Sequence, residues 1–219
     1  MSIRDRTSAF CGRFGLRVPI LLAPMAGASA PALSIAVANA GGLGACGALP
    51  MTPEEIGAWT REVRAAGNGL FQINLWIPDA RPVRDAEHEA RLREFLAAWG
   101  PPVSPNAGDT LPPDFNAQCK ALLDVHAPVV SSIMGLYPPD FVAKLKSAGI
   151  AWFANISTVA EAKAAAAAGA DVVVAQGMEA GDAQRMQAWA GQSCALARAE
   201  PAAEILRRLW REAVEMLRL

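Results

Sequence analysis

Short apolar segments recur along the chain, and most are followed by a segment with helical periodicity. The clearest of them is residues 171–175, Asp-Val-Val-Val-Ala. A run of β-branched residues without polar alternation is typical of a parallel strand that is covered on both faces. The same pattern predicts five more strands, at residues 19–24, 43–48, 70–75, 128–132 and 150–156.

Helices are predicted between these strands from the residues at their ends. Thr52 and Glu55, like Thr158 and Glu161, form the capping-box pattern in which each side chain bonds the other's backbone N–H. Pro at a first turn and Gly after a last turn mark other helix ends. The predicted helices are 31–40, 52–64, 139–148 and 158–168. Strand and helix alternate at a spacing of roughly 25 residues, which predicts a parallel sheet with right-handed crossovers.

Two segments depart from this alternation. A charged helix at 85–99, a Pro-rich loop at 100–113 and a helix at 114–123 form a long excursion, which is either a lid over a site or a solvated connector. After Asp182 the sequence predicts helices at 184–198 and 201–217 and no strand. A closed (β/α)8 barrel needs eight strands. The expected fold is therefore α/β, an incomplete TIM-barrel-type fold of about six parallel strands at 1–183 with a C-terminal helical segment at 184–219 that packs on it.

Composition and charge narrow the classes of partner. The 20 Lys and Arg residues balance 21 Asp and Glu residues, so no field favours nucleic acid or an anionic membrane surface. The first residues have no apolar stretch typical of a signal peptide, and no window is apolar enough for a membrane span. Four cysteines lie far apart and are expected to be free thiols, which favours a cytoplasmic location: Cys11, Cys46, Cys119 and Cys194.

Polar and small residues gather where the predicted strands end. Asn74 and Gln176 follow two strands, and Ala23-Pro24-Met25 follows the first. In a parallel barrel these ends converge on one face, where amides can hydrogen-bond a heterocycle in both directions. The alternative is that each amide is an ordinary turn residue.

Other candidate chemistry is weak. His88 lies on the charged helix and His126 precedes a strand, so surface or structural roles are expected for both, and no metal site is predicted. Glu179 is a carboxylate at a strand end, without a catalytic partner in its pattern. The sequence has no P-loop and no Gly-x-Ser-x-Gly motif.

Four motifs in this order resemble the nitronate monooxygenases, formerly called 2-nitropropane dioxygenases: Ala23-Pro-Met-Ala-Gly27, Asn39-Ala-Gly-Gly-Leu-Gly44, Gln72-Ile-Asn-Leu75 and Ala175-Gln-Gly-Met-Glu-Ala-Gly181. The resemblance implies an FMN-dependent (β/α)8 barrel that oxidises alkyl nitronates with O2 to carbonyl compounds and nitrite. It also implies which residues hold the cofactor. Ala23, Pro24 and Met25 would lie against the flavin ring, and three further residues would contact FMN: Asn74, Gln176 and Gly181.

The sequence departs from the family after Gly181. The family continues with Gly-His-x-Gly, whose His orients the substrate or acts as a base, whereas this chain continues with Asp182-Ala-Gln-Arg185. No His follows His126, so no catalytic residue is assigned. The two later strands whose glycine-rich ends hold the FMN phosphate are also missing, and residues 180–193 resemble the family's C-terminal segment. This favours the hypothesis of an internal deletion of roughly 100 residues joined at Ala180-Gly181.

Three functional alternatives remain open. The chain is an FMN-dependent nitronate monooxygenase, or a non-catalytic remnant or interaction protein, or a related FMN barrel. Within the last class an enoyl reductase shares the Ala-Pro-Met opening, whereas an IMP-dehydrogenase-like enzyme needs a catalytic Cys in a loop and Cys194 falls in a predicted helix. An open barrel exposes two sheet edges, which a homo-oligomer would cover.

Overall fold

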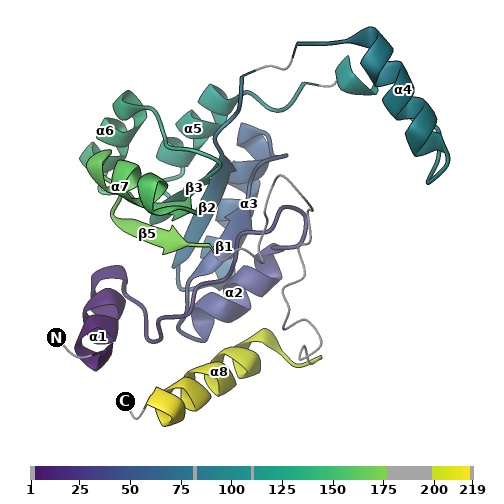
Figure 1. Cartoon of the computed structure of the whole chain (residues 1–219). Coiled ribbons are helices and arrows are strands. Elements are labelled where there is room, and N and C mark those ends of the chain that lie inside the picture. The colour runs from purple at the N-terminus through teal and green to yellow at the C-terminus, as the bar shows by residue number, and fades with distance from the viewer. Residues whose placement is uncertain (1–2, 81–82, 110, 177–198, 218–219) are drawn as a thin grey trace.

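A single parallel sheet forms the centre of the molecule (Figure 1). The structure, a computed structural model, describes residues 3–80, 83–109, 111–176 and 199–217. All neighbouring strands pair in parallel and in sequence order. The five strands are β1 Gly44–Gly47, β2 Phe71–Trp76, β3 Val129–Ile133, β4 Ala151–Ile156 and β5 Val172–Ala175. This is the predicted α/β arrangement, an incomplete TIM-barrel-type sheet.

Helices connect the strands and cover the outer face of the sheet (Figure 1). The capping boxes predicted from the sequence are both confirmed, at Thr52 with Glu55 and at Thr158 with Glu161. The Thr52 N–H donates to Glu55 Oε2 at 2.7 Å, so the start of the helix at Pro53–Ala66 is fixed by side chains at its own first turn. The connecting helices are α2 Pro31–Asn39, α3 Pro53–Ala66, α5 Phe115–Asp124, α6 Pro139–Ser147 and α7 Val159–Ala167.

The prediction of a strand over residues 19–24 is wrong in its extent. Only Leu21 pairs with the sheet, in a single parallel bridge to Leu43. The Leu43 N–H donates to Ile20 O at 3.0 Å, and the Leu22 N–H donates to Leu43 O at 2.9 Å. Prolines at both ends of the segment, at positions 19 and 24, remove donors that a longer ladder would need. The described sheet therefore has five strands and one bridged segment in place of the expected six strands.

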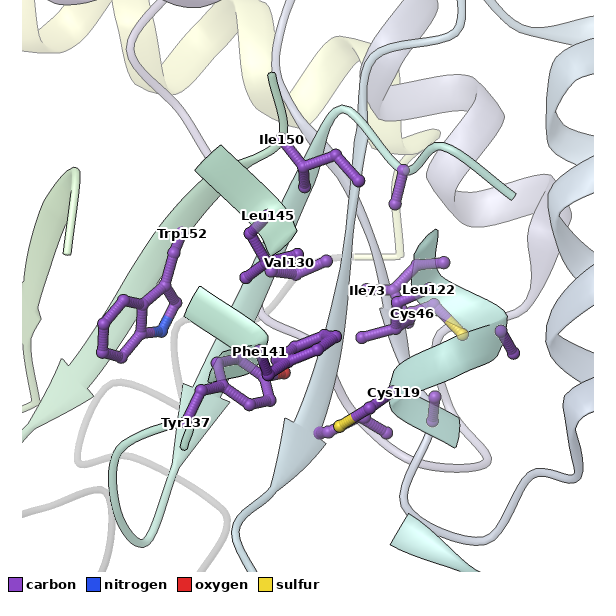
Figure 2. Packing of buried hydrophobic residues seen from close by; sticks show 14 of the residues in the cluster. Cys46, Ile73, Cys119, Leu122, Val130, Tyr137, Phe141, Leu145, Ile150 and Trp152 are labelled. Carbon is purple, nitrogen blue, oxygen red and sulfur yellow. The ribbon is translucent and has the colours of Figure 1, made fainter. Parts of the chain in front are cut away.

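The largest hydrophobic cluster lies between the outer face and these helices (Figure 2). Alternate strand residues point into it, as the two-residue period of a strand requires. Aromatic rings from the β3–α6 segment meet β4 here, since the Tyr137 ring lies 5.8 Å from that of Trp152. Other members of the cluster come from three strands and two helices: Cys46, Ile73, Val130, Leu122 and Leu145.

A helix that the sequence analysis did not predict, α1 Ile3–Phe14, packs against the inner face of the sheet. The Phe14 ring meets Phe153 of β4 edge-on at 4.9 Å. Arg13 extends the contact, because its Nη2 lies 2.7 Å from Asp171 Oδ1 at the start of β5. α1 therefore covers the amino end of the inner face.

Two further elements leave the alternation. The helix α4 Ala86–Ala97 projects from the body (Figure 1), and none of its residues is buried; the 3-10 turn η1 Ala107–Asp109 follows it. The C-terminal helix α8 Ala202–Leu217 lies along α2. Its Leu206 is buried against Val18 and Val37. A Cβ at Gly42 would come within 2.8 Å of Leu206 Cδ1, so the absence of a side chain there permits the contact.

Candidate functional site

The carboxyl edge of the sheet brings the predicted strand-end residues together. The parallel register places Gly47 beside Asn74, and Asn74 beside Ser131. Gln176 follows β5, and its N–H donates to Ile156 O at 2.9 Å. The ends of all five strands thus lie along one edge, which is where α/β proteins build their sites.

The amides of this edge are fixed by hydrogen bonds between strands. Asn74 is only 3% exposed, and its Nδ2 donates to Ser131 Oγ at 3.0 Å. Asn155 Nδ2 donates to Ser132 O at 3.0 Å across the next pair of strands. A side chain held in this way loses little further freedom when it contacts a ligand, so the edge is pre-organised.

The segment after the first bridge folds into a loop against the same edge. The Met25 N–H donates to Ser29 Oγ at 2.9 Å, and Ser29 Oγ donates to Ala23 O at 3.3 Å. The indole Nε1 of Trp59, from α3, donates to Ser29 O at 3.3 Å. Ser29 is therefore the centre of a set of bonds that holds the predicted ring-facing segment 23–25, and Met25 remains 40% exposed.

Gly47 is the point where this loop touches the sheet. A Cβ at Gly47 would lie 2.4 Å from Ala26 N and 2.7 Å from Met25 C, which no side chain can occupy. The loop and the end of β1 are thus in backbone contact. Of the six residues predicted to bind the cofactor, the structure places Ala23, Pro24 and Met25 in this loop, and Asn74 and Gln176 at the edge beside it.

Met134 follows β3 at the same edge, as one of the strand-end residues that the sequence predicts to converge there. Its backbone is left-handed, with φ of 65°, and its side chain is 47% exposed. A non-glycine residue in this conformation is held there by its surroundings, and such residues cluster at functional sites. The only sign of this left-handed conformation in the sequence is the Met134-Gly135 step directly after a strand.

Several candidate residues lie elsewhere. Gly181, Glu179 and Cys194 fall outside the described residues. His88 is exposed on α4, and His126 is exposed where α5 ends at the amino end of β3. An open hollow in the surface beside His126 is lined by α5 and α6, away from the carboxyl edge.

The thiol and phenol groups buried beside the carboxyl edge of the sheet are neutral. Burial raises the pKa of the Cys46 thiol, and that of the Cys119 thiol, to about 12. Burial also raises the pKa of Tyr137 well above its usual value, and its hydroxyl donates to Ser131 O at 3.0 Å. Among the described residues, no three His, Cys, Asp or Glu side chains gather as a metal site requires. The described edge offers amide, hydroxyl and thioether groups, which suit hydrogen bonding to a flat, uncharged ring.

The chain matches one family over most of its length. The family model described as Nitronate monooxygenase matches residues 8–191. The nitronate monooxygenase of Paraburkholderia phytofirmans is 36% identical over 177 residues, which cover 76% of this chain and 47% of that protein. That of Pseudomonas aeruginosa is 37% identical over 187 residues, covering 80% and 51%. The chain thus spans about half the length of the curated relatives it matches.

Solved structures agree in fold. The nitroalkane oxidase of Streptomyces ansochromogenes superposes with a TM-score of 0.61 at 35% identity, covering 75% of this chain and 47% of that one. FabK of Thermotoga maritima superposes with a TM-score of 0.57 at 26% identity, covering 78% and 44%. No described helix is both long enough and apolar enough to span a bilayer.

Proposed function

The chain belongs to the nitronate monooxygenase family, and on this basis we propose that it binds FMN at the carboxyl edge of its sheet and oxidises alkyl nitronates with O2 to carbonyl compounds and nitrite. The observation that carries the proposal is the backbone contact of the 23–26 loop with Gly47 beside Asn74. This contact brings together two of the motifs that resemble the family, 23–27 and 72–75, and the family match covers both.

The described residues fit the ring of a flavin. An isoalloxazine ring needs an apolar surface together with donors and acceptors around its rim. The exposed Met25 thioether supplies the first, and the edge carries the amides of Asn74 and Gln176 for the second. Because Gly47 has no side chain, the loop stays close to the sheet and the edge remains open beside it.

The phosphate of FMN places a separate demand on the protein. A phosphate is held by charge-assisted donors, which are the strongest single contacts available to it. By resemblance these would come from strand ends later in the barrel than β5. In this chain the described residues after Gln176 are 199–217, and they form the helix α8 and the residues just before it. We expect FMN to bind mainly through its ring, with lower affinity than in a complete barrel.

FMN, when bound, supplies the redox chemistry, and the chain supplies position and surroundings. Asn74, held by Ser131, would orient the ring, and the 23–25 loop would cover one face of it. An alkyl nitronate is already the conjugate base of a nitroalkane, so its oxidation requires no group that removes a proton from carbon. The lack of the family's His after Gly181 is therefore expected to impair nitroalkanes more than nitronates.

A second candidate is a non-catalytic remnant of the family. It is favoured by the departure after Gly181, where Asp182-Ala-Gln-Arg185 stand in place of the Gly-His-x-Gly that the resemblance implies. In this case the edge described above would keep its fold and bind FMN weakly or not at all.

The visible spectrum of the purified protein separates these candidates. We expect an added flavin to co-elute with the protein, to bleach when propane-2-nitronate is added without oxygen, and to recover in air. Asn74→Leu is expected to weaken FMN binding roughly tenfold, as the loss of a hydrogen bond in a buried site would, whereas Ser147→Ala on the surface of α6 should bind like the wild type.

A wild-type protein that retains no flavin, or whose flavin does not respond to nitronate, would overturn the proposed activity. Reduction of an enoyl thioester by a nicotinamide donor would instead favour an enoyl reductase, which the resemblance also leaves open.

A further inference from the structure

Gln118 of α5 makes an unusual set of contacts for a residue on the outer side of the sheet. It is 4% exposed, although its immediate neighbours in the core are apolar. Its Nε2 lies within hydrogen-bond distance of three carbonyl oxygens, those of Ala48 at 3.0 Å, Leu49 at 3.2 Å and Met51 at 2.7 Å. One side-chain amide thus serves a whole turn of backbone, residues 48–51.

This turn connects β1 to α3 and continues directly from the candidate site. The Ala48 N–H donates to Asn74 O at 3.0 Å, which ties the turn to the end of β2. Gly47, one residue earlier, is in backbone contact with Ala26. Two consecutive residues of this segment therefore touch the two parts of the site, and Gln118 holds the residues that follow them.

The turn has little other support from within. Its one backbone hydrogen bond among residues 48–51 is from the Met51 N–H to Ala48 O at 3.0 Å. Buried carbonyl oxygens that lose their donor are costly to keep, so the turn would move to reach water or another donor. Such a movement would reach Gly47 and the 23–26 loop, since these are linked to it by the contacts above.

We propose that Gln118 is a positioning residue for the candidate site. It fixes the 48–51 turn and, through Gly47, the loop that faces the flavin ring. The expected effect of Gln118 on FMN binding rests on the function proposed above. The expected effect of Gln118 on the 48–51 turn does not depend on FMN.

Two substitutions test it. Gln118→Met keeps the length and burial of the side chain and removes the donor, while Gln118→Glu keeps the shape and, buried as a neutral carboxyl, retains one O–H donor in place of two N–H donors. Lys120→Met, two residues away on the exposed side of α5, is the matched control. Amide hydrogen exchange is measured for the peptide that spans 44–51 and, as a reference, for the peptide that spans β4. FMN affinity is measured in parallel by quenching of flavin fluorescence.

In both Gln118 variants we expect exchange in 44–51 to rise roughly three- to tenfold with β4 unchanged, and FMN affinity to fall by a similar factor. Lys120→Met should change neither. Unchanged exchange in 44–51, or a rise that is equal in β4, would overturn the proposal, because Gln118 would then act only on general stability. A loosened turn with unchanged FMN affinity would also overturn it. If the wild type binds no FMN, the proposed function fails, and the exchange comparison still decides whether Gln118 orders the turn.

Discussion

At the scale of single residues, the candidate site depends on one position that has no side chain as much as on the side chains around it. Gly47 leaves room for the 23–26 loop, and Ser29 ties that loop to itself and to α3. Asn74 could be predicted as a site residue because an amide at a strand end is visible in the sequence. Gln118 could not, because it acts on carbonyl groups that lie far away in the chain.

Replacement of Gly47 should affect the site directly. Gly47→Ala would place a methyl group 2.4 Å from Ala26 N, so the loop must move. We expect the free energy of unfolding to fall by about 1–3 kcal/mol, as in other overpacked sites, together with a loss of FMN affinity. Gly57→Ala in α3 is the control, because its Cβ would meet only the end of the Arg61 side chain. That change should raise stability by about 0.5–1 kcal/mol. Urea titration of both variants is the measurement, and equal effects would contradict the steric argument.

Asp171 makes stability depend on pH at the opposite end of β5. Burial disfavours its charged form, but the hydrogen bond from the Trp152 N–H and the cations of Lys146 and Arg13 outweigh this and lower its pKa. A lowered pKa in the folded state contributes stability above the pKa of the unfolded state, and this is lost as the pH falls through the folded value. We expect Asp171→Asn to reduce the free energy of unfolding at pH 7 by roughly 1–2 kcal/mol.

The pH profile checks the cause of that loss. Asp171→Asn and the wild type should converge as the pH falls below about 4, the usual range of an Asp pKa. A constant difference down to pH 2 would show that the effect is one of packing and not of charge.

At the scale of elements, helix ends were the most predictable feature and isolated strands the least. The capping boxes of α3 and α7 are local in sequence, so the pattern alone identifies them. The extent of the first strand depends on which partners its backbone finds, and only Leu21 finds one in the sheet. The helix α1 was not predicted because it is mostly polar, and its few apolar residues are recognised only when they meet Phe153.

The C-terminal ends of α5 and α6 have the same backbone conformation, but one has a histidine where the other has a glycine. Both helices close with the same pair of backbone hydrogen bonds, around His126 in α5 and around Gly149 in α6. Both residues are left-handed, with φ of 46° and 69°. A side chain in this conformation costs about 1–2 kcal/mol, which glycine avoids.

We therefore expect His126→Gly to raise the free energy of unfolding by about 0.5–1 kcal/mol, since the more flexible unfolded glycine offsets part of the gain. Gly149→Ala, where a Cβ meets no other atom, should lower it by about 1 kcal/mol for the same reason. Chemical denaturation reports both, and a destabilised His126→Gly would reveal a contact of the imidazole that outweighs the backbone.

At the scale of the whole molecule, the order and direction of the strands followed from the alternation of elements, and so did the incomplete barrel. The position of α8 did not. In a closed barrel the last helix of the outer ring lies beside the first helix. Here α8 packs against α2, which is the first helix after the bridged segment. This supports the hypothesis of an internal deletion, which a locus encoding the intervening strands in frame would contradict. The division of the chain at residue 183 and the role of Gly181 lie outside the described residues and stay predictions.

The strand β5 is the last strand of the described sheet, and one residue of its outer face is partly exposed. Val173 points away from the inner face and is 37% exposed. Exposed apolar edge strands promote association, and a lysine at such a position suppresses it. We expect the wild type to self-associate through this edge and Val173→Lys to be more monomeric in size-exclusion chromatography with light scattering. Val172→Lys, on the inner face beside α1, should instead destabilise the fold. Identical elution of wild type and Val173→Lys would place any association elsewhere.

The contact between Gly42 and Leu206 also affects how the chain is made. The two residues are separated by nearly the whole alternation of strands and helices, and Leu206 covers apolar side chains of the segment before β1 and of α2. A ribosome adds about 5–20 residues per second, so that surface waits on the order of ten to thirty seconds for its cover to leave the exit tunnel. During synthesis the nascent chain therefore presents this patch to its surroundings or to a chaperone until Leu206 has left the exit tunnel.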